Sequence, residues 1–317
     1  MKEKKINING LRELLLVGVV LLLCVVWTVM NPQFLSVNNI TNILRQASYT
    51  AIAAVGMTMI IIIGEIDLSA GSLVCAAGLV GAVVCKNTNN VLLAVLAAIL
   101  VGALVGLCNG ILCAVGCLPG FIATLASMTI LRGLAYIITG GNSIVWSNDN
   151  FTKIGTGYIG PVPIPVIIMI IAIIFGVMLT TKFRFGRYIY AVGGNMETSR
   201  WSGIPVVKVK ILVYVIMGVL TAIAGLIVTT RLGSGQPSAG LNFEMDCITA
   251  SVVGGTSMSG GRGKVMGTVV GVLLLTVLTN GMTLVGMNTY WQQVLKGIII
   301  VVSVLLIQEE KQNNQNM

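Results

Sequence analysis

The chain has 317 residues, of which 56% are hydrophobic and 9% charged, and its mean hydropathy is +0.96. A soluble domain carries about 25% charged residues, so this chain could not cover its own surface in water. The composition therefore excludes a soluble enzyme, a nucleic-acid-binding domain and a disordered chain. The net charge is +9. The positions of the basic residues matter more than this sum, because basic residues near membrane spans set the orientation of the spans. Histidine is absent, and with it the commonest general base and metal ligand.

The apolar stretches of the chain predict ten membrane spans. A bilayer core of about 30 Å requires roughly 20 apolar residues in a helix. The longest charge-free interval, 87–131, must therefore hold two spans, which Gly116, Pro119 and Gly120 separate. The predicted spans are about 14–30, 46–64, 68–85, 91–113, 120–139, 164–180, 211–230, 244–258, 265–284 and 291–307. The eighth is short, so a full span and a broken or re-entrant helix both stay open. We expect an all-α polytopic membrane protein.

Basic residues predict the orientation of these spans. With both termini inside, the inside segments hold 13 Lys and Arg residues and the outside segments hold 4. By the positive-inside rule, this bias favours an N-in/C-in topology. The first apolar run has no Ala-x-Ala cleavage site, so it is interpreted as a retained span. We expect one transmembrane domain over 1–317, with a membrane domain over 14–307, cytoplasmic tails 1–13 and 308–317, and a cytoplasmic loop over 181–210.

The segment Gly64–Ser72 places two carboxylates between two apolar runs. Asp67 and Ser69 are both suitable N-caps for the helix that follows. One interpretation is a cytoplasmic turn with solvated acids near the interface. A second is a helix break, made by Gly64, Asp67, Ser69 and Gly71, whose open backbone lines a cavity. A third is a proton or cation site, because intramembrane acids often mark ion pathways.

The stretch Gly140–Pro165 is the largest polar segment expected outside the membrane. It contains three prolines, together with polar and aromatic side chains such as Asn142, Trp146 and Tyr158. It is either a plain extracellular loop or a landing surface for an external partner.

The loop 181–210 predicts a short helix on the cytoplasmic side. Asn195 is a suitable cap, Glu197 falls in the first turn, where the helix dipole favours an anion, and Gly203 with Pro205 forms a stop signal. The loop is either a basic interfacial segment or a docking helix for a cytoplasmic partner. The residues of this docking helix are Asn195, Met196, Glu197, Thr198, Ser199, Arg200, Trp201, Ser202 and Gly203.

The glycine-rich segment Gly254–Gly267 invites comparison with a phosphate-binding loop, but the match fails. Val265 follows the Gly-Lys pair where Ser or Thr is required, and Met258 occupies the position of the first glycine. The chain is therefore not expected to hydrolyse ATP. The glycines instead predict short helices and a turn that approach their neighbours closely. Those assigned to this helix break are Gly254, Gly255, Gly260, Gly261 and Gly263.

Several of these segments occur together in one family. The stretches Asn31–Ile40, Gly64–Ser72, Gly186–Gly203, Arg231–Gly240 and Gly254–Gly267 resemble, in order and in register, the permeases of ABC importers for ribose and other simple sugars. The resemblance covers nearly the whole chain. The permeases concerned form the branched-chain amino acid and ribose-type permease superfamily, and within it the chain most resembles the ribose permeases. One departure is Ser199-Arg200-Trp201, where family members commonly carry a small residue and Leu.

The resemblance implies a fold like that of type II ABC importers, in the cell membrane of a prokaryote. It implies a pore made with a second permease copy or paralogue, cytoplasmic ATP-binding subunits docked on Asn195–Gly203, and an extracytoplasmic sugar-binding protein. The chain itself would bind no metal or cofactor and catalyse no reaction, with ATP and Mg²⁺ held by the ATPase. No nucleic acid is expected as a partner.

Polar side chains within the predicted spans are candidates for the sugar path, because a neutral polyol requires hydroxyl and amide groups. By helix location alone they are Asn109, Thr124, Ser127, Thr129, Asn280 and Thr283. The main rival function is a secondary transporter driven by H⁺ or Na⁺, with Asp67 or Glu65 as the ion site.

Overall fold

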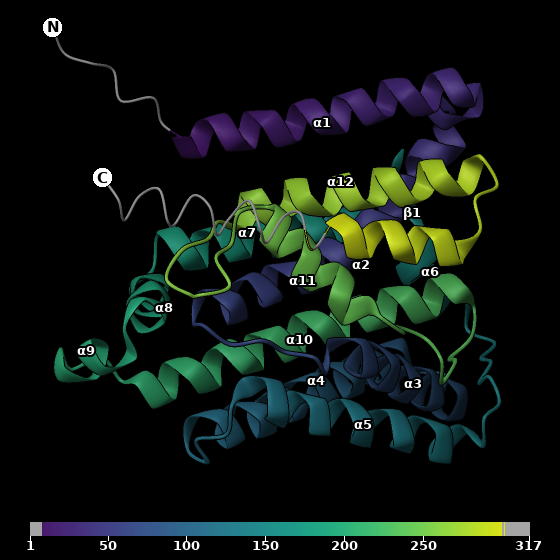
Figure 1. Cartoon of the computed structure of the whole chain (residues 1–317). Coiled ribbons are helices and arrows are strands. Elements are labelled where there is room, and N and C mark those ends of the chain that lie inside the picture. Colours follow the sequence, from purple (N-terminus) through teal and green to yellow (C-terminus); the bar gives the residue numbers. More distant parts are fainter. Residues whose placement is uncertain (1–7, 300, 302–317) are drawn as a thin grey trace, which may run out of the picture.

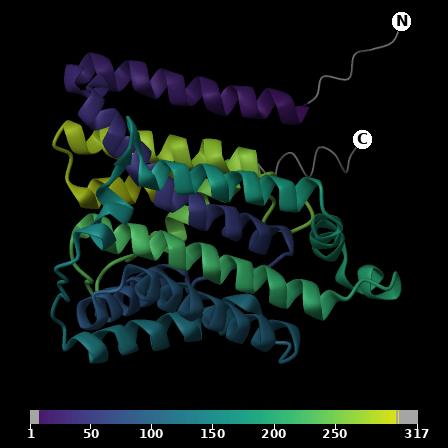
Figure 2. The same ribbon diagram turned by 180° about the vertical axis from the view of Figure 1, so that it is seen from behind.

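The structure is a computed structural model that describes residues 8–299 and residue 301. Figures 1 and 2 show a bundle of long, nearly parallel helices. The predicted tail 308–317 lies outside the described residues. The elements in chain order are α1 (Ile8–Met30), the 3₁₀ helix η1 (Pro32–Leu35), α2 (Val37–Ile62), α3 (Ala70–Thr88), α4 (Val91–Ala114), α5 (Gly120–Thr139), α6 (Asp149–Thr156), the antiparallel pair β1 (Tyr158–Ile159) and β2 (Val162–Pro163), α7 (Ile164–Thr181), α8 (Arg184–Gly194), α9 (Met196–Trp201), α10 (Val206–Leu232), α11 (Phe243–Val253) and α12 (Val265–Leu284). A last helical segment covers 289–299.

The long helices have the length and composition of membrane spans. Within the described residues, six helices are long and apolar enough to cross a bilayer, namely α3, α4, α5, α7, α10 and α12. The apolar part of α1, Leu15–Met30, is shorter, and α2 has 26 residues. The chain is therefore a multi-pass α-helical membrane protein, as its composition predicted.

The eighth predicted span is a short helix. Helix α11 has 11 residues, which gives a length of about 16 Å at 1.5 Å per residue, well below the bilayer core of about 30 Å. The chain before it consists mainly of turns. Gly235 pairs with Ile144 in an isolated bridge, and the Arg132 side chain donates to the carbonyls of Pro237 and Ala239 at 2.7 and 2.8 Å. The segment from 233 to 264 is thus a broken helix flanked by irregular backbone.

Close helix packing forms the centre of the bundle. Helix α10 packs against α4, α2 and α3. On α4, Gly102 lies against the backbone of Gly218, and Gly106 lies against the backbone of Tyr214, with no room for a Cβ atom at either glycine. Small residues at this spacing allow two helix backbones to approach closely where van der Waals contact drives association.

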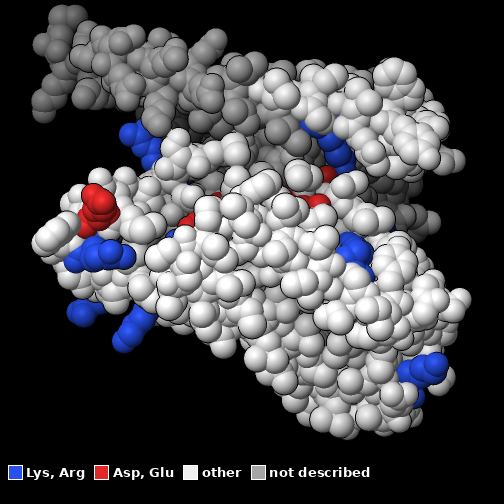
Figure 3. Space-filling model, turned by 60° about the horizontal axis from the view of Figure 1, so that its bottom comes forward, with Lys and Arg blue, Asp and Glu red and all other residues white. Residues whose placement is uncertain are grey.

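The outer surface of the bundle is apolar. Side chains such as Leu100 on α4 and Ile137 on α5 face outward, 58% and 77% exposed. Figure 3 shows a broad surface without charge, with most of the Lys and Arg side chains in view lying toward its ends. Such a surface suits hydrocarbon, where apolar side chains replace the polar face of a soluble helix.

Candidate functional site

Three motif segments that lie far apart in the sequence meet at one end of the bundle. The amide of Gly261 donates to the carbonyl of Ile62 at 2.8 Å. Gly193 in α8 packs so closely on Ile62 and Gly261 that a Cβ atom there would overlap the Ile62 carbonyl. Gly260 packs against the backbone of Gly193 and Gly64. We call the contact of Gly64, Gly193, Gly260 and Gly261 the glycine junction.

Positive backbone torsions explain why glycine occupies three of the four junction positions. Gly64 has φ +82°, Gly260 +79° and Gly261 +72°, values that side chains with a Cβ atom rarely adopt. The Tyr190 hydroxyl donates to the Gly263 carbonyl at 2.8 Å, which adds a second link between α8 and the loop 254–264. The loop after α11 is therefore attached both to the end of α2 and to α8.

At the other side of this loop, α11 and α12 approach through glycines. Gly254 lies against the backbone of Gly267, without space for a Cβ atom at either position. Gly255 turns the chain with φ +95°. All five glycines assigned to the second break thus lie in the turn between α11 and α12 or in its contacts with α2 and α8.

The predicted short helix projects beyond the ends of the long helices. Helix α9 covers Met196–Trp201, and Asn195 caps it by accepting a hydrogen bond from the Thr198 amide at 2.8 Å. Gly203 follows with φ +79°. Within the helix Ser199 is buried, whereas the Trp201 side chain is 90% exposed. Figure 1 shows α9 outside the body of the bundle, next to α8.

The charge pattern of α9 suits its dipole, with Glu197 in the first turn and Arg200 in the last. Glu197, Arg200 and Trp201 are all exposed. An exposed tryptophan beside opposite charges is typical of a surface that binds another protein. Helix α9 is thus a short, exposed helix attached through α8 to the glycine junction.

Between α2 and α3 the chain is irregular and buried. Asp67 is 2% exposed, so the interpretation of solvated acids near an interface is wrong for this residue. Its Oδ1 accepts hydrogen bonds from the Ser69 amide at 2.8 Å and the Ser69 hydroxyl at 2.6 Å. Ser69 occupies the N-cap position of α3 without a side-chain capping bond, and Asp67 satisfies its amide instead.

Three of the path candidates form one hydrogen-bonded network with this break. The Asn109 amide group donates to Ser69 Oγ at 3.1 Å, and the Asn109 oxygen accepts from the Ser127 hydroxyl at 2.5 Å. Thr124 Oγ1 accepts from the Leu68 amide at 3.0 Å and donates to the Gly120 carbonyl at 2.7 Å. The network ties the break to α4 and α5, with Ser127 half-buried at its outer end.

The other path candidates lie apart from this network. Asn280 of α12 exchanges two hydrogen bonds of 2.9 Å with Asn39 of α2. Thr129 is exposed on α5, and its hydroxyl donates to the Leu125 carbonyl within its own helix. Thr283 accepts a hydrogen bond from Gln292 at 3.2 Å.

A buried ion pair lies beside the break. Lys210 Nζ is 2.5 Å from Glu65 Oε1, with the two side chains 7% and 13% exposed. Glu65 Oε2 accepts from the Gly120 amide at 2.8 Å, at the start of α5, where the helix dipole favours a negative charge. The sequence assigned Lys210 to the cytoplasmic loop. In the structure α10 begins at Val206, so Lys210 lies in this helix and is buried.

The stretch expected outside the membrane is also structured. Asn148 caps α6 by accepting from the amides of Asn150 and Phe151. Trp146 and Phe151 pack edge to face with ring centroids 5.0 Å apart. The sequence predicted no helix here, although Asn148 before Asp149 is the start signal that could have revealed it.

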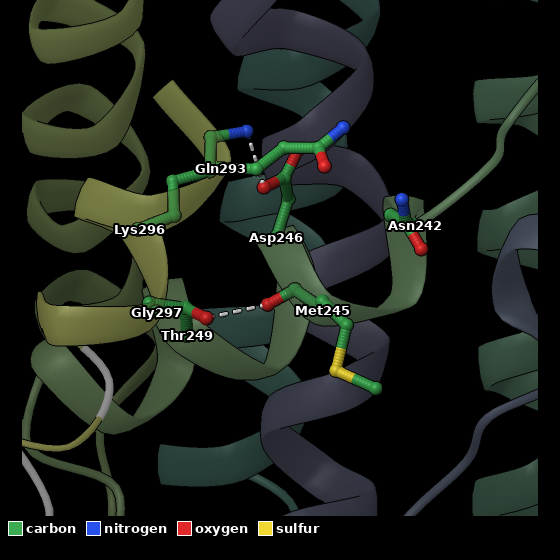
Figure 4. A pocket seen from close by; sticks show the side chains of 7 residues that line it. All are labelled: Asn242, Met245, Asp246, Thr249, Gln293, Lys296 and Gly297. Carbon is green, nitrogen blue, oxygen red and sulfur yellow. Dashed lines mark hydrogen bonds and ion pairs between the residues drawn. The ribbon is translucent and has the colours of Figure 1, made fainter. Parts of the chain in front are cut away.

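A small pocket opens between α11 and the segment 289–299. Figure 4 shows the Asp246 carboxylate and the Lys296 ammonium joined across it, 2.7 Å apart. Both residues fall within predicted spans, 244–258 and 291–307, without a predicted role. The pocket is lined by Asn242, Met245, Asp246, Thr249, Gln293, Lys296 and Gly297.

Neither acid of the first break has the surroundings of a cation site. Glu65 already carries the Lys210 counter-charge, and Asp67 is occupied by two donors from Ser69. Within the described residues, no group of three or more Cys, Asp or Glu side chains comes close enough to hold a metal ion.

The fold and these features define a class: a polytopic α-helical membrane protein with broken spans and a short exposed helix, as expected of a transport permease. Residues 39–304 match the family described as branched-chain amino acid transport system / permease component, and the chain belongs to that family.

Curated relatives cover the chain almost completely. It is 43% identical over 310 residues to the ribose import permease protein of Bacillus subtilis, covering 96% of each chain. It is 42% identical over 298 residues to the ribose import permease protein of Escherichia coli K12, covering 92% of each. It is 33% identical to the xylose transport system permease protein of Haemophilus influenzae, covering 96% of this chain and 97% of the relative. No solved structure matches the chain.

Proposed function

We propose that the chain is the membrane-spanning permease subunit of an ATP-driven importer of a monosaccharide, ribose or a similar simple sugar. The observation that carries the proposal is the glycine junction, where α8, the helix that precedes the exposed α9, contacts both the first helix break and the second, glycine-rich break. Relatives that are 42–43% identical over most of their length are ribose import permeases, which supports the choice of sugar.

In this proposal α9 docks on a cytoplasmic ATP-binding subunit, and Asn195–Gly203 form the coupling segment. A movement of α9 would pass through α8 to Gly193, and from there to the backbone of Ile62 and Gly261. Because both breaks meet this junction, one displacement would act on both. The permease forms no covalent bond with sugar, and ATP and Mg²⁺ are held by the partner.

The proposed topology has ten crossings with both termini in the cytoplasm. It is supported by the 13-to-4 distribution of basic residues. It is also supported by the arrangement in Figure 1, where α1 begins at the end of the bundle that holds α8 and α9, and the segment 289–299 runs back toward that end. The broken segment around α11 counts as one crossing in this topology.

The remaining partners follow from the same proposal. An extracytoplasmic sugar-binding protein would deliver sugar to the end of the bundle that carries the 140–165 stretch, and a second permease copy or paralogue would complete the pore. The polar network of Asn109, Thr124 and Ser127 would border the path at the first break, and Asn280 would contribute from α12.

Transport by reconstituted protein tests the proposal. The permease is inserted into proteoliposomes with its cognate ATPase and binding protein, and uptake of radiolabelled D-ribose and D-xylose is measured with and without ATP. We expect uptake of one of these sugars that depends on ATP and on both partners. Uptake by the chain alone under a H⁺ or Na⁺ gradient would instead support the secondary transporter with Asp67 or Glu65 as the ion site.

A further inference from the structure

Helix α7 lies at the periphery of the bundle and has the dimensions of a membrane span. It has 18 residues, which gives about 27 Å at 1.5 Å per residue, close to the bilayer core of about 30 Å. Only 28% of these residues are buried. Ile171, Ile174 and Met178 form an exposed apolar stripe along its outer face. The last turn of α7 therefore marks one boundary of the hydrocarbon.

Lys182 continues this stripe just beyond the end of α7. Its backbone has φ −101° and ψ −35°, and its amide donates to the Met178 carbonyl at 2.8 Å, so the residue still follows the helical path. Because Lys182 comes one helical turn after Met178 and three turns after Ile171, its side chain shares their outward face. A lysine in this place covers apolar surface with its carbon chain and carries its ammonium to the level of the lipid headgroups.

The first turn of α8 lies at the same depth as the end of α7. Phe183 turns the chain with an extended backbone, φ −87° and ψ 154°. Gly186 then packs on the carbonyls of Leu179 and Thr180, with no room for a Cβ atom. Figures 1 and 2 show α8 running across the ends of the long helices instead of alongside them. Helix α8 thus begins at the membrane boundary.

One face of α8 is buried and the opposite face is basic. Gly186, Ile189 and Val192 follow one another at intervals of three residues and are buried. Arg184 and Arg187 are also three residues apart, and both are exposed. The buried face holds α8 against the bundle, so the two arginines are directed away from it.

Lys182, Arg184 and Arg187 together form a surface with three uncompensated positive charges, which we call the 182–187 surface. The sequence contains no acidic residue from 182 to 194. Within the described part of the chain, none of the three side chains makes a hydrogen bond or an ion pair. Cations beside the end of a membrane span attract anionic lipid, with a gain in affinity of roughly fivefold for each Lys or Arg.

We infer that the 182–187 surface binds the headgroup of an anionic phospholipid in the leaflet at this end of the bundle. The lipid phosphate would accept hydrogen bonds from Lys182, Arg184 and Arg187, and the acyl chains would lie along the apolar stripe of α7. This continuity of the cations with an exposed apolar stripe favours a lipid over a protein partner. The bound lipid would hold the start of α8, whose other end carries Gly193 of the glycine junction. The inference goes beyond the proposed function, because a lipid site does not depend on the transported substrate.

The test measures lipid binding by the full-length permease in detergent. Native mass spectrometry gives the affinity of the first bound lipid when phosphatidylglycerol or the zwitterionic phosphatidylcholine is added. We expect the wild type to prefer phosphatidylglycerol. The double variant Arg184→Gln with Arg187→Gln should bind it about 25-fold more weakly, at roughly fivefold for each cation, and should bind phosphatidylcholine as the wild type does. Arg184→Lys with Arg187→Lys keeps both charges and should recover most of the loss.

The matched control is Lys208→Gln with Arg262→Gln, which removes two exposed cations from other elements at the same end of the bundle. It should bind phosphatidylglycerol like the wild type. An equal loss of affinity in the control would show a general effect of charge and no site. Wild-type affinity in the Arg184 and Arg187 glutamine variant would also overturn the inference. If that variant binds the lipid normally but no longer co-purifies with the ATPase, the 182–187 surface belongs to the contact with the ATPase.

Discussion

Lys210 of α10 and Glu65 in the break after α2 form a buried ion pair, with 2.5 Å between Nζ and Oε1. Lys210 also donates to the Cys113 carbonyl at the end of α4, at 3.3 Å, and Glu65 accepts from the Gly120 amide at the start of α5. The pair therefore connects α10 to both ends of the α4–α5 turn and to the first break. A connection of this kind fixes the relative positions of elements that lie far apart in the sequence.

Removing one partner of this pair should destabilise the protein strongly. In Glu65→Gln the Lys210 ammonium stays buried without its counter-charge, a change that typically costs about 3–5 kcal/mol. We expect a large drop in the unfolding temperature of the detergent-solubilised protein. The double variant Glu65→Gln with Lys210→Met should recover most of the loss, because it leaves no uncompensated charge.

The matched control for this experiment is Lys208→Met, on the same helix two residues away and exposed. It should unfold within about 0.5 kcal/mol of the wild type. Equal destabilisation by Lys208→Met and Glu65→Gln would contradict a specific role for the buried pair.

The glycine junction makes a second prediction. Gly193→Ala places a Cβ atom against the Ile62 carbonyl and the Gly261 amide, and both contacts are to backbone. The junction must open to accept it, so we expect ATP-dependent sugar uptake to fall by about tenfold or more while the ATPase stays bound. Such uncoupling is measured as sugar molecules imported per ATP hydrolysed.

Gly194→Ala is the control for the junction. At this neighbouring glycine, no atom lies within 4 Å of the position that a Cβ atom would occupy, and φ is not positive. The variant should transport as the wild type does. If Gly193→Ala also imports as many sugar molecules per ATP as the wild type, the contact of α8 with Ile62 does not couple ATP hydrolysis to transport.

The sequence identified each of these motifs but not their contact. Glycine spacing and the Asn195 cap are local signals, and they predicted the breaks and α9 at nearly the observed residues. The packing of Gly193 on Ile62 joins residues about 130 positions apart, which no local pattern encodes. The same reason explains Lys210: a lysine at the start of an apolar run looks like an interfacial charge until its buried partner Glu65 is known.

The first break offers a test of the rival function. Asp67→Asn keeps an oxygen that can accept from the Ser69 amide and hydroxyl, so it replaces two charge-assisted hydrogen bonds with neutral ones, each weaker by about 1 kcal/mol. We expect a modest loss of stability and a reduction of ATP-dependent uptake of a few fold. Complete loss of transport together with a flattened pH profile would point to Asp67 as an ion site.

The exposed face of α9 gives the most direct test of coupling. Replacement of Glu197, Arg200 and Trp201 by Ala leaves the Asn195 cap and the buried Ser199 in place. The helix should therefore persist, while the ATPase loses its largest apolar contact and two charges. Because loss of a central tryptophan at an interface costs about 2 kcal/mol or more, we expect co-purification with the ATPase to fall at least tenfold, with membrane insertion unchanged.

Trp291→Ala separates this effect from the loss of any exposed tryptophan. Trp291 is 63% exposed and lies near the start of the segment 289–299, at the end of the bundle opposite α9 (Figure 1). It should co-purify with the ATPase at the wild-type level. If the triple variant retains the ATPase as well, the coupling surface lies elsewhere on the chain, and the glycine junction would have to receive its displacement from another element than α9.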